Sequence, residues 1–238
     1  MSQISDQLCC IVPAAGIGER MLAERPKQYL PFRSTTILDH TLRRLLSSDL
    51  IDKIILVLNK NDTYWPQSSF AKHSKITVVE GGDERADSVL KGLIKAEQLY
   101  GDTSWLLVHD AARPCILKAD IERLIKVTFL NQQGAILATP IHDTVKEYIE
   151  DGVTKTLPRS KLWRALTPQL FRVEELKKAL LTAQNKAVLV TDEANAIEIN
   201  GGFVHLVEGR HDNLKVTTPA DLLLADFYVE QQERIECE

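Results

Sequence analysis

Short apolar runs that alternate with longer amphipathic stretches constrain this chain more than any other feature of its sequence. The runs with the length and composition of strands are Leu8–Val12, Lys53–Leu58, Ile76–Glu80, Trp105–His109 and Ala135–Pro140. The stretches between them that place apolar residues at helical spacing are Ile37–Ser47, Arg85–Leu99 and Asp120–Asn131. Apolar strands that alternate with helices are typical of parallel sheets covered by helices on both faces. The pattern therefore predicts an α/β fold with a mostly parallel central sheet.

The pattern changes after Pro140, where two charged and alternating stretches flank a turn signal. Asp151-Gly152 favours a tight hairpin turn between Thr144–Ile149 and Val153–Leu157. Because charged strands do not suit the centre of a parallel sheet, we expect residues 141–159 to form a hairpin arm that projects from the body. A two-stranded arm is marginally stable alone, so a partner subunit is the natural surface for it to pack on. The elements expected after the arm are a return segment, two helices, a strand and a last helix, at Leu162–Leu170, Arg172–Ala183, Asp192–Ile199, Phe203–Val207 and Pro219–Gln232.

Composition and charge exclude several classes of protein. The chain has 238 residues, of which 44% are hydrophobic and 26% charged, as expected for one globular domain over residues 1–238. The net charge of −4 argues against nucleic-acid binding, which uses a broad basic surface. No apolar run approaches the roughly 20 residues of a membrane span, and the acidic start Met1–Asp6 does not fit a secretion signal. Four cysteines without C-x-x-C spacing indicate buried thiols in a reducing cytosol, so we expect a cytoplasmic protein.

The loop after the first strand has the features of a site for an anionic ligand. After Pro13, the small residues Ala14, Ala15, Gly16 and Gly18 leave backbone N–H groups accessible. Two cations, Arg20 and Lys27, follow them. Met21 stands where a Rossmann fingerprint needs a small residue, and no Gly-Lys-Ser/Thr follows Gly18 as in a P-loop. The loop therefore indicates a nucleoside triphosphate held by backbone amides and side chains. A simpler interpretation is a glycine-rich turn with solvated Arg and Lys side chains.

Two further strand ends carry polar side chains at the same edge of the predicted sheet. One of them is Gly81-Gly82-Asp83-Glu84-Arg85, which with the nearby Ser88 suits the edge of a nucleobase. A simpler interpretation is a tight turn in which Asp83 caps a helix. A carboxylate stands at the end of the strand in His109-Asp110-Ala111-Ala112-Arg113-Pro114, where it suits a sugar hydroxyl or a phosphate-bound metal. A simpler interpretation is a local ion pair between Asp110 and Arg113. Thr191 is expected to cap the helix that follows it. The absence of a G-x-S-x-G elbow argues against a serine hydrolase, and the spacing of the six histidines argues against a zinc site.

Over nearly the whole chain, these segments closely resemble the 2-C-methyl-D-erythritol 4-phosphate cytidylyltransferases of the non-mevalonate isoprenoid pathway. The motifs that carry the resemblance are Pro13-Ala14-Ala15-Gly16-Ile17-Gly18-Glu19-Arg20-Met21, Pro26-Lys27-Gln28-Tyr29-Leu30, Gly81-Gly82-Asp83-Glu84-Arg85, Asp110-Ala111-Ala112-Arg113-Pro114, Thr167-Pro168-Gln169, Thr191-Asp192-Glu193-Ala194 and Asn213-Leu214-Lys215-Val216-Thr217. One departure is Leu166, where many members of the family carry Gln. The resemblance implies a Rossmann-like nucleotidyltransferase fold and an enzyme that joins CTP and 2-C-methyl-D-erythritol 4-phosphate, with release of diphosphate. It also implies that Mg²⁺ is held mainly by the CTP phosphates, without a set of protein ligands.

The resemblance assigns roles to individual residues. Arg20 and Lys27 would stabilise charge at the α-phosphorus, and Arg159 and Lys215 would position the substrate phosphate. The residues expected to bind the two substrates are Pro13, Ala14, Ala15, Gly16, Gly18, Gly82, Asp83, Ser88, Asp110, Ala111, Arg113, Thr144, Thr167, Thr191 and Asp212. The resemblance further implies a homodimer in which each arm crosses to its neighbour. Two alternatives remain: a cytidylyltransferase for ribitol 5-phosphate, and a catalytically silent nucleotide-binding subunit.

Overall fold

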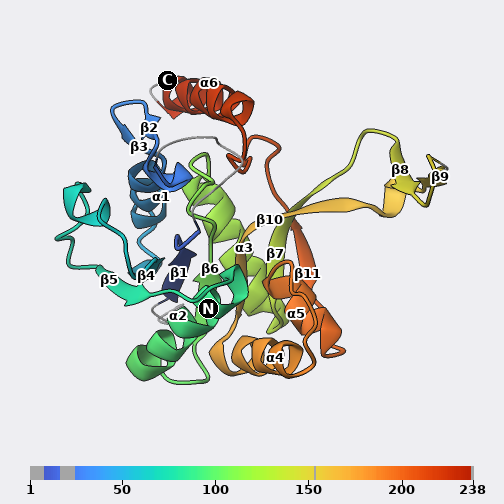
Figure 1. Ribbon diagram of the computed structural model, residues 1–238, viewed down its shortest axis with the longest axis horizontal. Helices are drawn as coiled ribbons and strands as arrows, with labels where there is room; N and C mark the ends of the chain where they lie inside the picture. Colours follow the sequence, from blue (N-terminus) through green and yellow to red (C-terminus); the bar gives the residue numbers. More distant parts are fainter. Residues whose placement is uncertain (1–7, 17–24, 153, 237–238) are drawn as a thin grey trace.

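A seven-stranded sheet forms the centre of the molecule (Figure 1). The computed structural model describes residues 8–16, 25–152 and 154–236. In chain order, the strands of the sheet are β1 (Leu8–Pro13), β4 (Ile51–Leu58), β5 (Ile76–Glu80), β6 (Trp105–Val108), β7 (Ala135–Pro140), β10 (Trp163–Arg172) and β11 (His205–Glu208). Their spatial order is β11-β7-β10-β6-β1-β4-β5, and every neighbouring pair is parallel except the two that β10 makes. The predicted α/β fold with a mostly parallel sheet is therefore confirmed.

Helices cover both faces of this sheet. Their bounds are α1 (Ile37–Leu46), α2 (Arg85–Tyr100), α3 (Lys118–Asn131), α4 (Val173–Asn185), α5 (Glu193–Ile199) and α6 (Pro219–Glu236). Successive side chains of β1 point to opposite faces of the sheet, as in any strand. Leu8, Cys10 and Val12 therefore pack with α1 and α3. Cys9 and Ile11 pack with α2, α4 and α5. Both sides of β1 are thus buried, as the unbroken apolar run predicts. A smaller apolar cluster holds α6 against α1.

Strand β10 is the main difference from the sequence-based expectation. The segment predicted as a simple return from the arm lies in the centre of the sheet, antiparallel to both β6 and β7. Its first residues, from Trp163 to Ala165, are exposed, whereas Leu166 to Phe171 are buried. The pairing with β7 shifts register between Ala165 and Gln169, around the cis peptide bond before Pro168. Proline interrupts a hydrogen-bonded ladder, so the sequence pattern conceals this strand.

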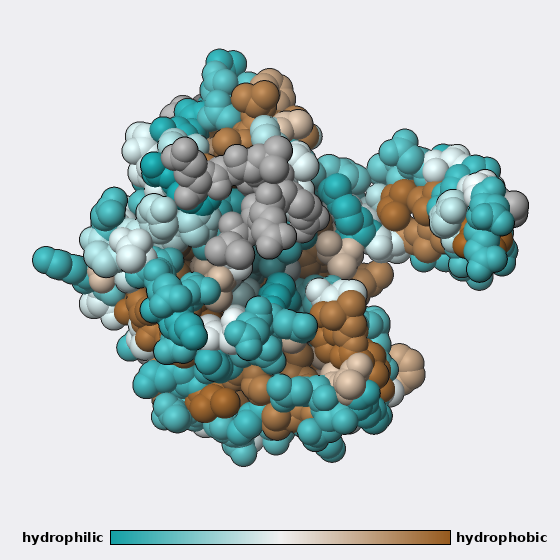
Figure 2. All heavy atoms as spheres, viewed as in Figure 1, coloured by the Kyte–Doolittle hydropathy of each residue, from teal (hydrophilic) through white to brown (hydrophobic). Residues whose placement is uncertain are grey.

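The predicted hairpin arm is present. Its strands, β8 (Val145–Tyr148) and β9 (Thr154–Leu157), pair antiparallel with each other and with no other strand of the described residues. Asp151 and Gly152 both have positive φ, as a tight hairpin turn requires. Figures 1 and 2 show the arm extending away from the body, with apolar surface on it beside hydrophilic surface. Tyr148 is 71% exposed there, which leaves an aromatic ring without cover in the single chain.

Two helix caps differ by one residue from the sequence-based expectation. Glu84, rather than Asp83, caps α2, because its side chain and that of Asp87 form a reciprocal capping box. Asp192, rather than Thr191, caps α5, since its carboxylate accepts a hydrogen bond from the Asn195 N–H at 2.9 Å. These shifts leave Asp83 and Thr191 exposed to solvent rather than engaged as caps.

Cys9, Cys10 and Cys115 are buried free thiols, as predicted, and Cys237 lies outside the described residues. Burial raises the pKa of the Cys9 and Cys115 thiols to about 12. These thiols are therefore poor nucleophiles at neutral pH. None of the helices in the described ranges is long and apolar enough to cross a membrane.

Candidate active site

Two adjoining pockets lie at the carboxyl edge of the sheet. The first has a volume of about 290 Å³ and is lined by Pro13, Ala14, Ala15, Gly16, Lys27, Gln28, Gly82, Asp83, Glu84, Arg85, Ser88, Asp110, Ala111, Ala112 and Lys215. The second has a volume of about 170 Å³ and is lined by Arg85, Asp110, Arg113, Ala165, Leu166, Thr167, Gln169, Thr191, Asp192 and Lys215. Arg85, Asp110 and Lys215 line both pockets and so form the boundary between them.

The topology of the sheet explains why the first pocket forms. Loops that follow β1, β5 and β6 meet at one edge, because these strands are parallel. The Ala14 N–H donates to the Val57 carbonyl at 2.8 Å, and the Gly81 N–H donates to the Leu58 carbonyl at 2.7 Å. A Cβ atom on Gly81 would lie 2.6 Å from the Ala15 Cβ and 2.9 Å from the Ser88 Oγ. Glycine is therefore required for the two loops to approach this closely.

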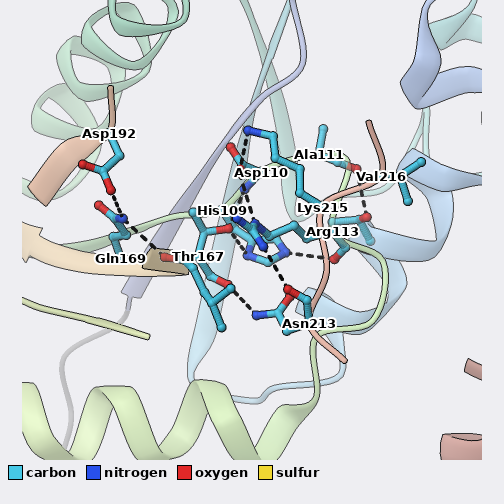
Figure 3. A network of polar contacts seen from close by, with 12 residues as sticks. His109, Asp110, Ala111, Arg113, Thr167, Gln169, Asp192, Asn213, Lys215 and Val216 are labelled. Atoms are coloured by element: carbon cyan, nitrogen blue, oxygen red, sulfur yellow. Dashed lines mark hydrogen bonds and ion pairs between the residues drawn. The ribbon is translucent and has the colours of Figure 1, made fainter. Parts of the chain in front are cut away.

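Asp110 is the electrostatic centre of the site (Figure 3). One carboxylate oxygen, Oδ1, accepts from the Arg85 Nε at 3.2 Å, and the other, Oδ2, lies 3.0 Å from the Lys215 Nζ and 3.2 Å from the Arg113 Nε. Burial opposes ionisation of this carboxyl, but the charges of Arg85, Lys215 and Arg113 hold its pKa well below its ordinary value. Asp110 is therefore ionised at neutral pH and surrounded by cations, which makes it unsuited to accept a proton.

Buried hydrogen bonds fix the backbone beneath Asp110. Its N–H donates to the Thr167 Oγ1 at 3.1 Å, and that hydroxyl lies 3.0 Å from the His109 Nδ1. The His109 Nε2 lies 3.2 Å from the Arg113 carbonyl. The Arg113 carbonyl can only accept, so the proton of the neutral ring is assigned to Nε2, and Nδ1 accepts from the Thr167 hydroxyl. Burial lowers the pKa of His109 to about 4, so the ring is neutral and both nitrogens are engaged.

Asn213 ties the last predicted motif to the same network. The Arg113 guanidinium donates to the Asn213 carbonyl at 2.9 Å, and the Asn213 side-chain amide donates to the Thr167 carbonyl at 2.8 Å. Figure 3 shows these side chains converging from separate segments, with Lys215 directed at Asp110. The motifs around residues 110, 167 and 213 therefore form one polar unit, although they are far apart in the sequence.

Lys27 and Gln28 close the first pocket on the side of the first loop. The Lys27 ammonium donates to the Val216 carbonyl at 3.2 Å, and the Gln28 amide donates to the Ala14 carbonyl at 2.6 Å. With Arg85, Arg113 and Lys215, Lys27 makes four cations around the two pockets. Lys27 and Lys215 can contact the phosphate groups of a ligand, while Asp110 balances part of the positive charge. Since Asp110 and His109 are both engaged, the arrangement suits alignment of phosphates rather than proton transfer.

Most of the residues predicted to bind substrates do lie in these pockets. Those that line one or both are Pro13, Ala14, Ala15, Gly16, Lys27, Gly82, Asp83, Ser88, Asp110, Ala111, Arg113, Thr167, Thr191 and Lys215. Gly18 and Arg20 lie outside the described residues. Sequence reasoning did not select Arg85, Gln169 or Asp192 as site residues, although each stands in a quoted motif. Their partners are distant in sequence, so no local signal could have identified them.

Three predicted residues do not line either pocket in the single chain: Thr144, Arg159 and Asp212. Thr144 is exposed on the arm, and the exposed Arg159 donates to the His142 carbonyl at 2.7 Å at the base of the arm. Asp212 accepts from the Arg210 guanidinium at 2.6 Å and from the Gln232 amide at 3.1 Å. Asp212 thus anchors the segment that carries Lys215 to α6.

The donor set gives little support to a metal site built by the protein. Among the described residues, no group of three or more His, Cys, Asp or Glu side chains is arranged to hold a metal ion. The pocket carboxylate that is buried, Asp110, already directs both oxygens at cations. The residues present fit a Mg²⁺ ion that is bound through substrate phosphates, as this ion commonly is.

Comparisons with known proteins agree on one family. The family model described as 2-C-methyl-D-erythritol 4-phosphate cytidylyltransferase matches residues 8–231. A protein of that name from Photobacterium profundum is 47% identical over 233 residues, covering 96% of this chain and 98% of the relative. One from Escherichia fergusonii is 47% identical over 231 residues, covering 96% of each chain. The crystal structure of the Francisella tularensis protein of that name superposes with a TM-score of 0.81 at 38% identity, covering 93% of this chain and 99% of the other.

Proposed function

The chain belongs to the 2-C-methyl-D-erythritol 4-phosphate cytidylyltransferase family, and we propose from its site how it transfers the cytidylyl group of CTP to 2-C-methyl-D-erythritol 4-phosphate. The observation that carries this mechanism is the pair of pockets that share Arg85, Asp110 and Lys215. CTP occupies the first pocket, and the polyol phosphate occupies the second. The two phosphates then meet at the shared boundary.

The reaction is an in-line displacement at phosphorus. An oxygen of the polyol phosphate forms a bond to the α-phosphorus of CTP, while the bond from that phosphorus to the bridging oxygen breaks and diphosphate leaves with the electron pair. The attacking phosphate is already an anion at neutral pH, so no general base is needed. Catalysis then consists of alignment and of stabilising charge on the five-coordinate phosphorus. The engaged state of Asp110 and His109 agrees with this mechanism.

Residues of the first pocket hold CTP. Backbone groups of residues 14–16 and 18 bind the triphosphate, and Arg20 and Lys27 stabilise charge at the α-phosphorus. Gly82, Asp83 and Ser88 contact the cytosine, and Asp110 and Ala111 contact the ribose, with Pro13 at the base of the loop. The CTP phosphates would hold Mg²⁺, and the ion would neutralise part of their charge. The support for this arrangement is that the described members of the set line one cavity.

The second pocket holds the polyol phosphate. Lys215 faces its phosphate, and Arg113, Thr167 and Thr191 lie around the erythritol portion, supported by their position around the cavity. Thr144 and Arg159 complete the site from the partner subunit, because neither residue lines a pocket of its own chain and the arm extends away from the body (Figure 1). Asp212 acts indirectly, by holding the segment that carries Lys215. We therefore propose a cytoplasmic homodimer of a single domain, assembled through arm residues 141–159.

A substrate-panel assay tests this function. Purified protein is given CTP and Mg²⁺ with either 2-C-methyl-D-erythritol 4-phosphate or ribitol 5-phosphate, and diphosphate release is measured. We expect a kcat/KM at least roughly a hundredfold higher for the methylerythritol substrate, because a pocket matched to one polyol leaves polar groups unpaired with another. Preference for ribitol 5-phosphate would replace the proposed substrate. CTP binding without diphosphate release would instead indicate a silent nucleotide-binding subunit.

A further inference from the structure

Arg85 and Glu193 form a bidentate ion pair beneath the boundary of the two pockets. The Arg85 Nη1 lies 2.6 Å from the Glu193 Oε1, and the Nη2 lies 3.1 Å from the Oε2. Arg85 is the first residue of α2, and Glu193 is the first residue of α5, 108 positions later in the chain. The Glu193 side chain is only 1% exposed and does not line either pocket. A carboxylate buried this deeply needs its charged partner.

The guanidinium of Arg85 is shared between two carboxylates. Its Nε and Nη2 both lie 3.2 Å from the Asp110 Oδ1, while Nη1 and Nη2 are directed at Glu193. Burial opposes the charge on Arg85, but Glu193 and Asp110 raise its pKa above its ordinary value. These contacts use the polar edges of the guanidinium, and its charge is balanced by two acids. Arg85 is therefore suited to orient Asp110 rather than to bind a phosphate.

The two oxygens of Asp110 have separate partners as a result. Oδ1 faces Arg85, whereas Oδ2 faces Lys215 at 3.0 Å and Arg113 at 3.2 Å. If Glu193 lost its charge, Arg85 would be free to turn fully onto Asp110 or toward a phosphate. Either change would let the Asp110 carboxylate rotate and would so move Oδ2, the oxygen that holds the Lys215 ammonium at the boundary of the pockets.

The base of Glu193 is itself held in place. The Gln169 side chain donates to the Asp192 Oδ2 at 2.9 Å and accepts from the Ala194 N–H at 2.9 Å. The start of α5 is thereby attached to β10, and Glu193 stands between these two anchored neighbours. The Arg85–Glu193 ion pair thus connects the start of α2, beside the first pocket, to the start of α5, beside the second pocket.

We propose that Glu193 is a positioning residue for the polyol phosphate, acting through Arg85 and Asp110 on Lys215. This inference rests on the proposed function, because it assigns Lys215 to the substrate phosphate. Glu193 does not touch either substrate. Its charge instead sets where the Lys215 ammonium stands when the polyol phosphate arrives.

The Glu193→Gln variant tests the proposal, since it keeps the shape of the side chain and removes the charge. We expect the KM for 2-C-methyl-D-erythritol 4-phosphate to rise roughly tenfold or more, because an interaction with a charged group is weakened at the boundary. The Kd of CTP, measured by calorimetry with Mg²⁺, should change less than this KM, because Lys27 and the backbone of residues 14–16 line the first pocket away from the ion pair. Glu193→Asp should recover part of the lost affinity, because it restores the charge.

A matched control is available at Glu97, which pairs with Lys177 through both carboxylate oxygens, at 2.9 and 2.6 Å, outside the two pockets. Glu97→Gln makes the same substitution in a half-buried ion pair and should leave both kinetic constants unchanged. A Lys215→Met background separates positioning from general stability. If Glu193 acts through Lys215, Glu193→Gln should add little to the KM change that Lys215→Met already causes.

Three results would overturn the inference: unchanged kinetics in Glu193→Gln, equal weakening of both substrates with a lowered Tm, or effects that add fully to those of Lys215→Met. The wild-type protein is assayed first. Absence of diphosphate release from CTP and 2-C-methyl-D-erythritol 4-phosphate would contradict the proposed function, and the inference with it. An active wild type with an unaffected Glu193→Gln variant would contradict the inference alone.

Discussion

Individual side chains in the pockets are specialised by their surroundings rather than by their type. Asp110 is ionised because three cations face it, and His109 is neutral because it is buried with both nitrogens engaged. Lys27 is half-buried, lines the first pocket and donates to the Val216 carbonyl at 3.2 Å. Asp110 and His109 hold the geometry of the site, and we propose that Lys27 contacts the triphosphate.

Replacement of Lys27 should therefore affect the reaction rather than the fold. We expect Lys27→Ala to lower kcat by roughly 10²–10³, the usual effect of removing one preorganised donor from a transition state. The Tm should change little. The exposed Lys60, which lies outside both pockets, provides the matched control in Lys60→Ala. A folded Lys27→Ala protein with near-normal kcat would remove Lys27 from the mechanism.

Two buried histidines should make stability depend on pH. Burial, with a smaller effect of nearby Arg44, lowers the pKa of His40 to about 4, and burial lowers that of His109 to about 4, from an ordinary value of 6.5. Between pH 6.5 and pH 4 the unfolded chain binds more protons, so the free energy of unfolding rises with pH in this window. When the pH falls from 7.5 to 5.5, each histidine should lower the free energy of unfolding by about 1 kcal/mol.

Urea unfolding at these two pH values measures the effect. His40→Asn keeps a donor for the Pro114 carbonyl, which lies 3.1 Å from the His40 Nδ1, and removes the titrating ring. The variant should show about half of the wild-type pH dependence if the two histidines contribute equally. An unchanged slope would show that His40 does not contribute to it.

At the scale of elements, the loops after β1, β5 and β6 were predictable and the strand β10 was not. Parallel apolar strands place their carboxyl ends together, so the sequence alone located residues 13–16, 81–83 and 110–113 at one edge. Strand β10 combines an exposed start at residues 163–165, a proline and a register shift, and these obscure its periodicity. Glu193 could not be identified either, because its role depends on a partner 108 positions away.

The loop between β5 and α2 should determine the choice of base. Gly82, Asp83 and Ser88 line the first pocket, and the Gly82 N–H donates to the Ser88 Oγ at 3.2 Å, which fixes the polar edge of the loop. A pocket that hydrogen-bonds cytosine leaves buried groups unpaired with uracil. We therefore expect kcat/KM for CTP to exceed that for UTP by at least about a hundredfold. Equal use of both nucleotides would contradict the assignment of this loop to the base.

At the scale of the whole molecule, the arm separates residues that we propose for one reaction. Lys27 lines the first pocket, whereas Arg159 lies at the base of the arm and lines neither pocket. The exposed Tyr148 and Ile149 give the arm an apolar surface for a second subunit. Two-fold symmetry would then create two equal sites, each with residues from both chains.

Subunit mixing tests this shared site. Lys27→Ala and Arg159→Ala proteins, each inactive alone, are combined and allowed to exchange subunits. A mixed dimer then has one site with both defects and one intact site, so about a quarter of wild-type activity should return after random exchange. If both residues served one site from a single chain, mixing could not assemble an intact site. Demonstrated exchange without recovered activity would therefore exclude the shared site.

The central position of β10 also has a consequence for how the chain is synthesised. In the finished sheet β10 lies between β6 and β7 and pairs with both. It comes after both in the chain, so it leaves the ribosome last of the three. At 5–20 residues per second, roughly 2 to 6 s pass between the end of β7 and the end of β10. During that interval β7 has neither of its partner strands, β10 and β11, and its unpaired backbone groups are open to other chains. Nascent chains stalled before β10 should therefore remain protease-sensitive and prone to aggregation, and protection should begin once β10 has emerged.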